Sequence, residues 1–205
     1  MLKKADRRRQ ILDAAKQVFA SRGYHATGVA DIIAACDIAR GTFYLHFESK
    51  RALFEILLNE FLAVIEQRVN RLDETAGVSA IRDQLRANVA AVLATFSENP
   101  EMTRLILHEA VGLDKGFDDK LAEFYDRLAG LIERALELGQ TTGIVRPLDT
   151  RILAAALLGS VKELVLRIQG GRLPGSLDRV VDETMTFLVR ALFVPELLVA
   201  DQDGG

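Results

Sequence analysis

Apolar residues recur at helical spacing along almost the whole chain. Between residues 11 and 19 they fall at positions i, i+3, i+4, i+7 and i+8, which places them on one face of a helix. Similar apolar segments cover residues 29–36, 40–45, 53–65, 81–96, 102–106, 117–136, 152–168 and 176–193. No segment alternates apolar and polar residues between turn signals, as a half-buried strand would. The pattern predicts an all-α fold of about nine helices.

Residues that favour helix ends stand between these segments. Gly23 suits the left-handed position that follows a helix, and Thr27, Ser49 and Asp149 are expected to cap the helices that follow them. Pro100 is expected in the first turn of its helix. The second and third helices are short and are separated by a tight turn at residues 37–38. This is the layout of a helix-turn-helix.

Charge is distributed unevenly along the chain, although the net charge is only −3. Residues 1–54 hold ten Lys and Arg against five Asp and Glu, whereas residues 55–205 hold sixteen against twenty-four. A basic segment of this kind indicates contact with a polyanion. The single cysteine, Cys36, rules out an internal disulfide and is typical of a reducing cytoplasm. The longest apolar run, 152–161, is too short for a membrane span and ends at Lys162.

The helix-turn-helix segment resembles the DNA-binding region of the tetracycline-repressor (TetR) family. The resemblance rests on Gly-Tyr-His-Ala-Thr at 23–27, Asp-Ile at 31–32, Arg-Gly-Thr-Phe-Tyr-Leu-His-Phe at 40–47 and Ser-Lys-Arg-Ala-Leu at 49–53. It covers about residues 8–54. It implies a DNA-binding head at residues 1–52 and a ligand-binding and dimerisation body at residues 53–205. The protein is accordingly expected to be a cytoplasmic bacterial repressor. As a homodimer it would bind a pseudo-palindromic operator in double-stranded DNA and be released by a small, mostly hydrophobic effector.

The resemblance also implies which residues contact DNA. They are Thr27, Arg40, Gly41, Thr42, Tyr44, His46 and Lys50. Arg40 suits base readout, because a guanidinium can donate two hydrogen bonds to guanine. Tyr44, His46, Thr27 and Lys50 suit phosphate contacts, which set register without reading sequence. The basic run at residues 3–9 is either a solvated tail or an arm in the minor groove.

Two residues depart from the family pattern. Asp37 stands in the turn where relatives usually have Gly, and Asp tolerates a left-handed conformation better than most residues. Ala39 stands where relatives usually have Ser, which removes a side-chain cap worth ~1 kcal/mol from the third helix. Neither change is expected to disrupt the head.

The body offers two further sets of candidate residues. The polar candidates for a mostly hydrophobic ligand cavity are Asn88, Arg104, His108 and Tyr125, which are otherwise surface or hydrogen-bonded core residues. In the last two helices, Ala155 and Gly159 lie four residues apart and permit close helix approach. The family resemblance implies that these helices form a symmetric four-helix dimer interface. The expected interface residues are Ala155, Leu158, Gly159, Lys162, Thr184, Phe187 and Leu188.

An enzyme is the competing class of protein. The sequence has no nucleophile elbow, phosphate-binding loop, dinucleotide fingerprint or zinc-protease motif. Two of its three histidines lie in the head, so neither a metal site nor a cofactor is expected. The open alternative is a regulator or activator that a protein partner controls without small-molecule induction.

Overall fold

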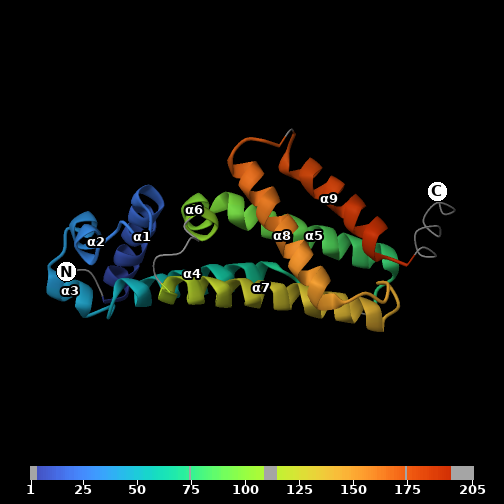
Figure 1. Cartoon of the computed structure of the whole chain (residues 1–205), viewed down its shortest axis with the longest axis horizontal. Helices are drawn as coiled ribbons and strands as arrows, with labels where there is room; N and C mark the ends of the chain where they lie inside the picture. The colour runs from blue at the N-terminus through green and yellow to red at the C-terminus, as the bar shows by residue number, and fades with distance from the viewer. Residues whose placement is uncertain (1–3, 74, 109–114, 174, 195–205) are drawn as a thin grey trace. The chain divides into compact units, whose positions relative to one another are not determined.

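The computed structural model describes residues 4–73, 75–108, 115–173 and 175–194. Within these residues the chain forms nine helices and no strand, which confirms the predicted all-α fold (Figure 1). The helices are α1 (Lys4–Arg22), α2 (Val29–Cys36), α3 (Arg40–Tyr44), α4 (Lys50–Arg68), α5 (Val78–Glu98), α6 (Pro100–His108), α7 (Lys115–Thr141), α8 (Thr150–Gln169) and α9 (Leu177–Leu192). No helix in this part of the chain is long and apolar enough to cross a membrane.

The chain divides into two compact units. The first unit comprises Met1–Ala63 and Asn99–Tyr125, and the second comprises Val64–Glu98 and Asp126–Gly205. Helices α4 and α7 therefore contribute to both units. In the first unit α1 packs against α2 and α6, and in the second α5 packs against α8 and α9. The first unit thus groups α6 and the start of α7 with the helix-turn-helix.

The core of the first unit follows the predicted apolar stripe of α1. Ile11, Ala15 and Phe19 are fully buried, as is Phe43 of α3, and Phe47 is 3% exposed. Burying a large apolar side chain contributes about 1.5–3 kcal/mol, so the two phenylalanines hold the short α3 in place. A five-residue helix would not form alone in water.

Most of the helix ends form as the sequence predicts. The Asp149 carboxylate accepts hydrogen bonds from the backbone N–H groups of Arg151 and Ile152, both at 3.0 Å. The Ser49 hydroxyl accepts one from the N–H of Ala52 at 3.1 Å. Asp37 has the left-handed conformation expected of it, with φ 50°. The turn between α2 and α3 therefore forms without glycine.

The prediction that Thr27 caps the second helix is wrong by one residue. Gly28 is the N-cap of α2, and its N–H donates to the Asp31 carboxylate at 2.7 Å. The Thr27 hydroxyl instead donates back to the carbonyl of Gly23 at 2.7 Å, and Thr27 is only 1% exposed. A hydroxyl engaged in the preceding turn cannot reach the first N–H groups of the helix.

Candidate nucleic-acid interface

Helix α3 begins without a side-chain cap, as the alanine at its start predicts. Ala39 has an extended conformation, and its side chain makes no capping hydrogen bond. Gly41 is exposed, and a Cβ added to it would meet no atom within 4 Å. No side chain covers the backbone at Gly41, so a macromolecule can approach the helix closely at this residue.

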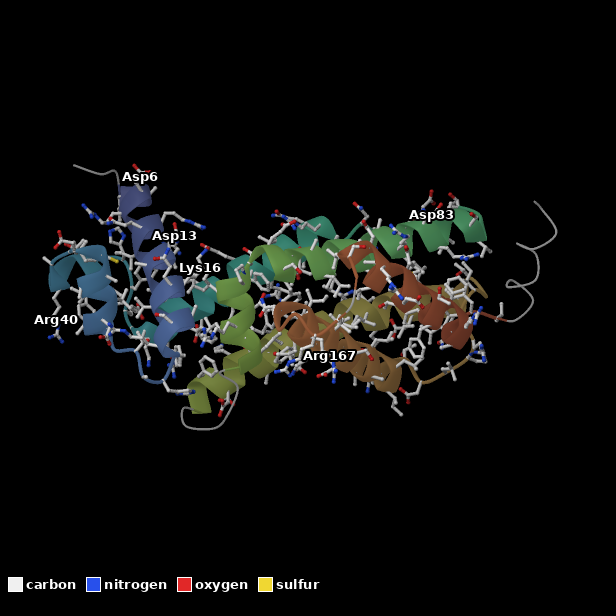
Figure 2. The ribbon with its side chains drawn as sticks, turned by 90° about the horizontal axis from the view of Figure 1, so that it is seen from above. Asp6, Asp13, Lys16, Arg40, Asp83 and Arg167 are labelled. Carbon is white, nitrogen blue, oxygen red and sulfur yellow. The ribbon has the colours of Figure 1, made fainter. Side chains whose placement is uncertain are left out.

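The outer side of α3 presents cationic, aromatic and aliphatic groups. Arg40 is exposed and points outward (Figure 2), and its guanidinium lies 5.8 Å from the ring centroid of Tyr44. Tyr44 is 47% exposed, whereas the adjacent Phe43 is fully buried. Thr42 and His46 are half-buried. The helix-turn-helix thus separates an anchoring apolar side from an exposed side that combines hydrogen-bond donors with an aromatic ring.

Sequence reasoning missed Leu45, which is 77% exposed. The available signal was its position four residues after Gly41, because residues i and i+4 share a helix face. An exposed aliphatic side chain beside Tyr44 suits contact with a thymine methyl group.

The turn before α2 is held by two residues that were predicted to contact phosphate. The ammonium of Lys50 donates to the carbonyls of Tyr24 at 2.8 Å and Thr27 at 2.9 Å, and it lies 4.1 Å from the centroid of the Tyr24 ring. Two of the three ammonium protons are therefore used within the protein. Together with the buried hydroxyl of Thr27, these contacts fix the shape of residues 23–28.

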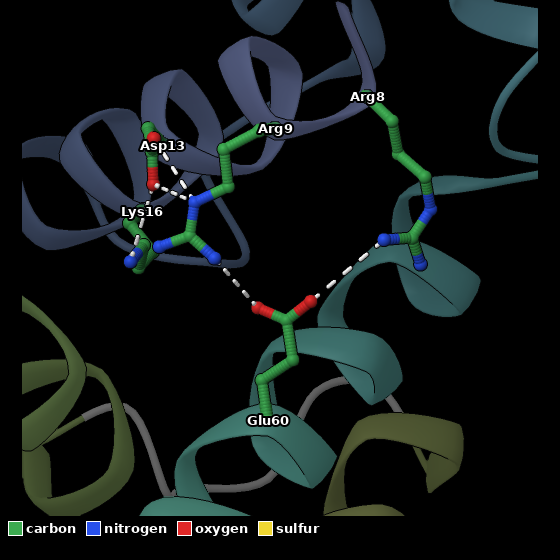
Figure 3. Close-up of polar contacts among 5 residues, drawn as sticks. All are labelled: Arg8, Arg9, Asp13, Lys16 and Glu60. Carbon is green, nitrogen blue, oxygen red and sulfur yellow. Dashed lines mark hydrogen bonds and ion pairs between the residues drawn. The ribbon is translucent and has the colours of Figure 1, made fainter. Parts of the chain in front are cut away.

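An ion-pair cluster joins α1 to α4 (Figure 3). The Glu60 carboxylate lies 3.7 Å from the guanidinium of Arg8 and 3.2 Å from that of Arg9. Arg9 also pairs with Asp13 at 3.2 Å, and Asp13 pairs with Lys16 at 3.3 Å. These side chains are between 24% and 57% exposed, so solvent screens the cluster and each pair contributes about 0–1 kcal/mol.

The predicted ligand-binding residues are not gathered in one unit. Asn88 belongs to the second unit, whereas Arg104 and Tyr125 belong to the first. The Asn88 amide makes two 2.8 Å hydrogen bonds with the backbone of Asn70, and the Tyr125 hydroxyl donates to the carbonyl of Ile106 at 3.0 Å. Burial raises the pKa of Tyr125. Arg104 is exposed, and the side chain of His108 lies outside the described part of the structure.

The predicted dimer residues of α8 include several exposed small side chains. Ala155 and Gly159 are exposed together with Ala156 and Ser160, and a Cβ added to Gly159 would meet nothing within 4 Å. Ile152, at the start of the same helix, is 68% exposed. Leu158 and Lys162 are half-buried. This part of α8 leaves room for close approach by another helix.

Helix α9 adds a large exposed aromatic side chain. Phe187 is 62% exposed, and it lines an open hollow of about 440 Å³ with Glu183, Thr186, Arg190 and Ala191. Thr184 and Leu188 are half-buried, and the Thr184 hydroxyl is bonded to the carbonyl of Val180 at 2.7 Å. The exposed apolar groups of α8 and α9 resemble a surface that is covered in an assembly.

Two family models match this chain. Residues 11–57 match the model for bacterial regulatory proteins of the tetR family, and residues 79–166 match a tetracyclin repressor-like C-terminal domain. The first match covers the helix-turn-helix and the second extends from α5 into α8. The chain belongs to the TetR family of bacterial transcription regulators, as the sequence predicted.

A curated relative agrees with this assignment, and solved structures share the fold. The chain is 29% identical over 173 residues to the HTH-type transcriptional repressor DhaR of Mycobacterium sp. (strain GP1), covering 84% of this chain and 87% of the relative. A Clostridium perfringens putative fatty acid metabolism regulator has the same fold, with a TM-score of 0.75 at 23% identity over 90% of this chain and 99% of the other. The transcriptional regulator FadR from Bacillus subtilis, solved with stearoyl-CoA, has a TM-score of 0.70 at 22% identity over 88% and 97%.

Proposed function

We propose that this protein is a repressor that binds a pseudo-palindromic operator as a homodimer and is released by a small, mostly hydrophobic effector. The observation on which this rests is the composition of α3. Its outer side exposes Arg40 and Tyr44, whereas Phe43 and Phe47 anchor it to the first unit. In helix-turn-helix proteins the start of such a helix enters the major groove.

The roles of the side chains follow from their exposure. Arg40 reads a base, because its guanidinium can donate two hydrogen bonds to guanine. The DNA backbone or a thymine methyl group is contacted by Tyr44, His46 and Thr42. Gly41 permits the close approach of the DNA. Thr27 and Lys50 stay candidates for phosphate contact. Their hydrogen bonds within residues 23–28 support a second role, in which they orient the start of α2 toward the DNA.

Dimerisation and induction rest on different observations. The exposed Ala155, Gly159 and Phe187 support a symmetric interface formed by α8 and α9. The FadR structure with stearoyl-CoA supports an effector with a long apolar portion. Such an effector must bind the DNA-free conformation more tightly, and 1.4 kcal/mol of coupling gives a tenfold loss of operator affinity.

DNA selected by the protein from a random duplex library provides the test. Arg40→Ala should lose about 1–3 kcal/mol, mainly through one base pair of the selected sequence. Adding Tyr44→Ala should reduce binding further without changing the thermal stability, since both side chains are exposed. Arg71→Ala, which removes one exposed charge from the second unit, is the control. Unchanged affinity in the double variant would refute the assignment of α3.

A further inference from the structure

The first turn of α7 inserts an aromatic ring beside the turn that precedes α2. Phe117 is fully buried, and its ring centroid lies 4.3 Å from that of Tyr24 and 5.2 Å from that of His25. It also stacks on Phe54 of α4 at 4.5 Å. Phe117 is therefore the point at which α7, α4 and residues 23–28 meet within the first unit.

A displacement of Tyr24 moves residues 23–28 together, because hydrogen bonds connect them. The carbonyl of Tyr24 accepts from the N–H of Thr27 at 3.3 Å and from the Lys50 ammonium at 2.8 Å. Lys50 also holds the carbonyl of Thr27, the residue before the N-cap of α2. Because protein interiors are close-packed, a shift of the Phe117 ring must displace these groups together.

We propose that Phe117 is a positioning residue that couples the first turn of α7 to the DNA-binding surface. With its ring in place, residues 23–28 hold α2, and through the Asp37 turn α3, in the conformation that binds DNA. A movement of α7 that withdraws the ring lowers DNA affinity although every side chain that contacts DNA is still present. This inference rests on the proposed DNA-binding function, and it adds the residue through which that function is controlled.

Phe124 is a matched control two turns further along α7. Its ring pairs with Phe61 of α4 at 6.3 Å and with Tyr125 at 5.6 Å, and it is 3% exposed. The two phenylalanines therefore share a helix, a partner helix and a degree of burial. Phe117 alone of the two has ring contacts with Tyr24 and His25.

The first experiment compares Phe117→Leu with Phe124→Leu. The probe is a duplex of about 30 base pairs selected by the wild-type protein, long enough for two half-sites one DNA turn apart. Both variants should lower the melting temperature similarly. Phe117→Leu should lose about tenfold in affinity, whereas Phe124→Leu should lose less than about twofold. The slope of log affinity against log salt should stay close to that of the wild type in both variants, because neither substitution removes a charged side chain.

The second experiment uses the reciprocity of coupling. If the α7 turn controls DNA binding, then DNA must stabilise that turn equally. The same duplex should therefore slow hydrogen exchange at the amides of residues 117–121 in the wild type and in Phe124→Leu, but not in Phe117→Leu. The wild-type measurement holds even if Phe117→Leu fails to fold.

The outcomes separate this inference from the proposed function. Equal affinities for the two leucine variants, or wild-type exchange at residues 117–121 that DNA leaves unchanged, would overturn the role of Phe117 and leave DNA binding intact. A wild-type protein that selects no duplex at all would overturn both.

Discussion

Two regions of the described chain expose large hydrophobic side chains. One is the end of α3, where Tyr44 and Leu45 are 47% and 77% exposed. The other comprises α8, α9 and the loop before α8, where Leu148, Ile152 and Phe187 are 42%, 68% and 62% exposed. Contiguous exposed apolar patches are typical of binding surfaces, and both regions are proposed to be such surfaces.

The neighbouring residues distinguish the two regions. On α3 the apolar groups stand beside Arg40 and His46, and this combination suits the phosphates and base edges of DNA. On α8 they stand beside the small exposed residues Ala155 and Gly159, which suit close packing of a second helix. The two regions share hydrophobic exposure, and their different charge and side-chain size support the two different partners proposed for them.

Gly159→Leu should produce the largest effect and would separate the two surfaces. The added side chain meets open space within one subunit, and Leu is a better helix former than Gly by somewhat less than the ~1 kcal/mol that separates Gly from Ala, so the subunit should stay folded. The dimer should dissociate, and operator affinity should fall about 100-fold or more because the half-sites are then bound separately. Light scattering and operator titration provide the measurements.

The control for this variant is Gly77→Leu, since a Cβ at Gly77 also meets nothing within 4 Å and the residue precedes α5. It should leave both association and DNA binding unchanged. A wild-type protein that is monomeric at micromolar concentration would overturn the proposed α8–α9 dimer interface.

Part of the pattern behind the two proposed surfaces is short-range and can be read from the sequence. Phe43 and Phe47 are apolar residues four positions apart, a spacing that predicts a shared buried side, and the spacing of Ala155 and Gly159 places both on one face of a helix. The ligand candidates depended on packing between distant segments. Asn88 instead binds the backbone of Asn70, a contact that helical spacing within α5 does not reveal.

The hydrogen bonds of Lys50 were hard to predict for a more local reason. The sequence alone gave Lys50 no partner other than phosphate, because the carbonyls of Tyr24 and Thr27 become acceptors only when the turn packs against the start of α4. Every residue has the same backbone carbonyl, so the sequence does not show which carbonyls will accept a side-chain hydrogen bond. Roles that depend on carbonyl acceptors are therefore hard to predict.

Arg146→Met should weaken the α8–α9 region by loosening the end of α9. The guanidinium donates to the carbonyls of Phe193 at 2.9 Å and Arg190 at 2.7 Å, where a cation also complements the helix dipole. Removing both bonds should cost about 1–3 kcal/mol in the free energy of unfolding. Arg151→Met, whose side chain is 87% exposed, is the control. If denaturant titration showed equal losses in the free energy of unfolding for the two variants, the role of Arg146 at the end of α9 would be contradicted.

Tyr125→Phe should alter the pH dependence of stability without altering either surface. Losing the bond to the carbonyl of Ile106 should cost about 1 kcal/mol at neutral pH. Burial raises the pKa of Tyr125 in the folded state above its ordinary value of about 10. The contribution of Tyr125 to the free energy of unfolding is thus complete below about pH 10. It declines as the pH rises further, because the tyrosine proton is released at a lower pH in the unfolded chain than in the folded one. Melting temperatures between pH 8 and 11 should decline less steeply in the variant, and parallel curves would contradict this.

Glu60→Gln should have the smallest effect, confined to the unit that contains the α3 surface. The change removes the charge that Arg8 and Arg9 share, but Arg9 keeps its pair with Asp13 at 3.2 Å. Because these side chains are partly solvated, the loss of stability should stay below about 1 kcal/mol and shrink further in high salt. Glu66→Gln is closely matched, since Glu66 lies on the same helix, is equally exposed at 38% and pairs with Arg127 in the second unit. At low salt only Glu60→Gln should increase hydrogen exchange in α1. Equal exchange in the two variants would show that apolar packing, and not the ion pairs, holds α1 against α4.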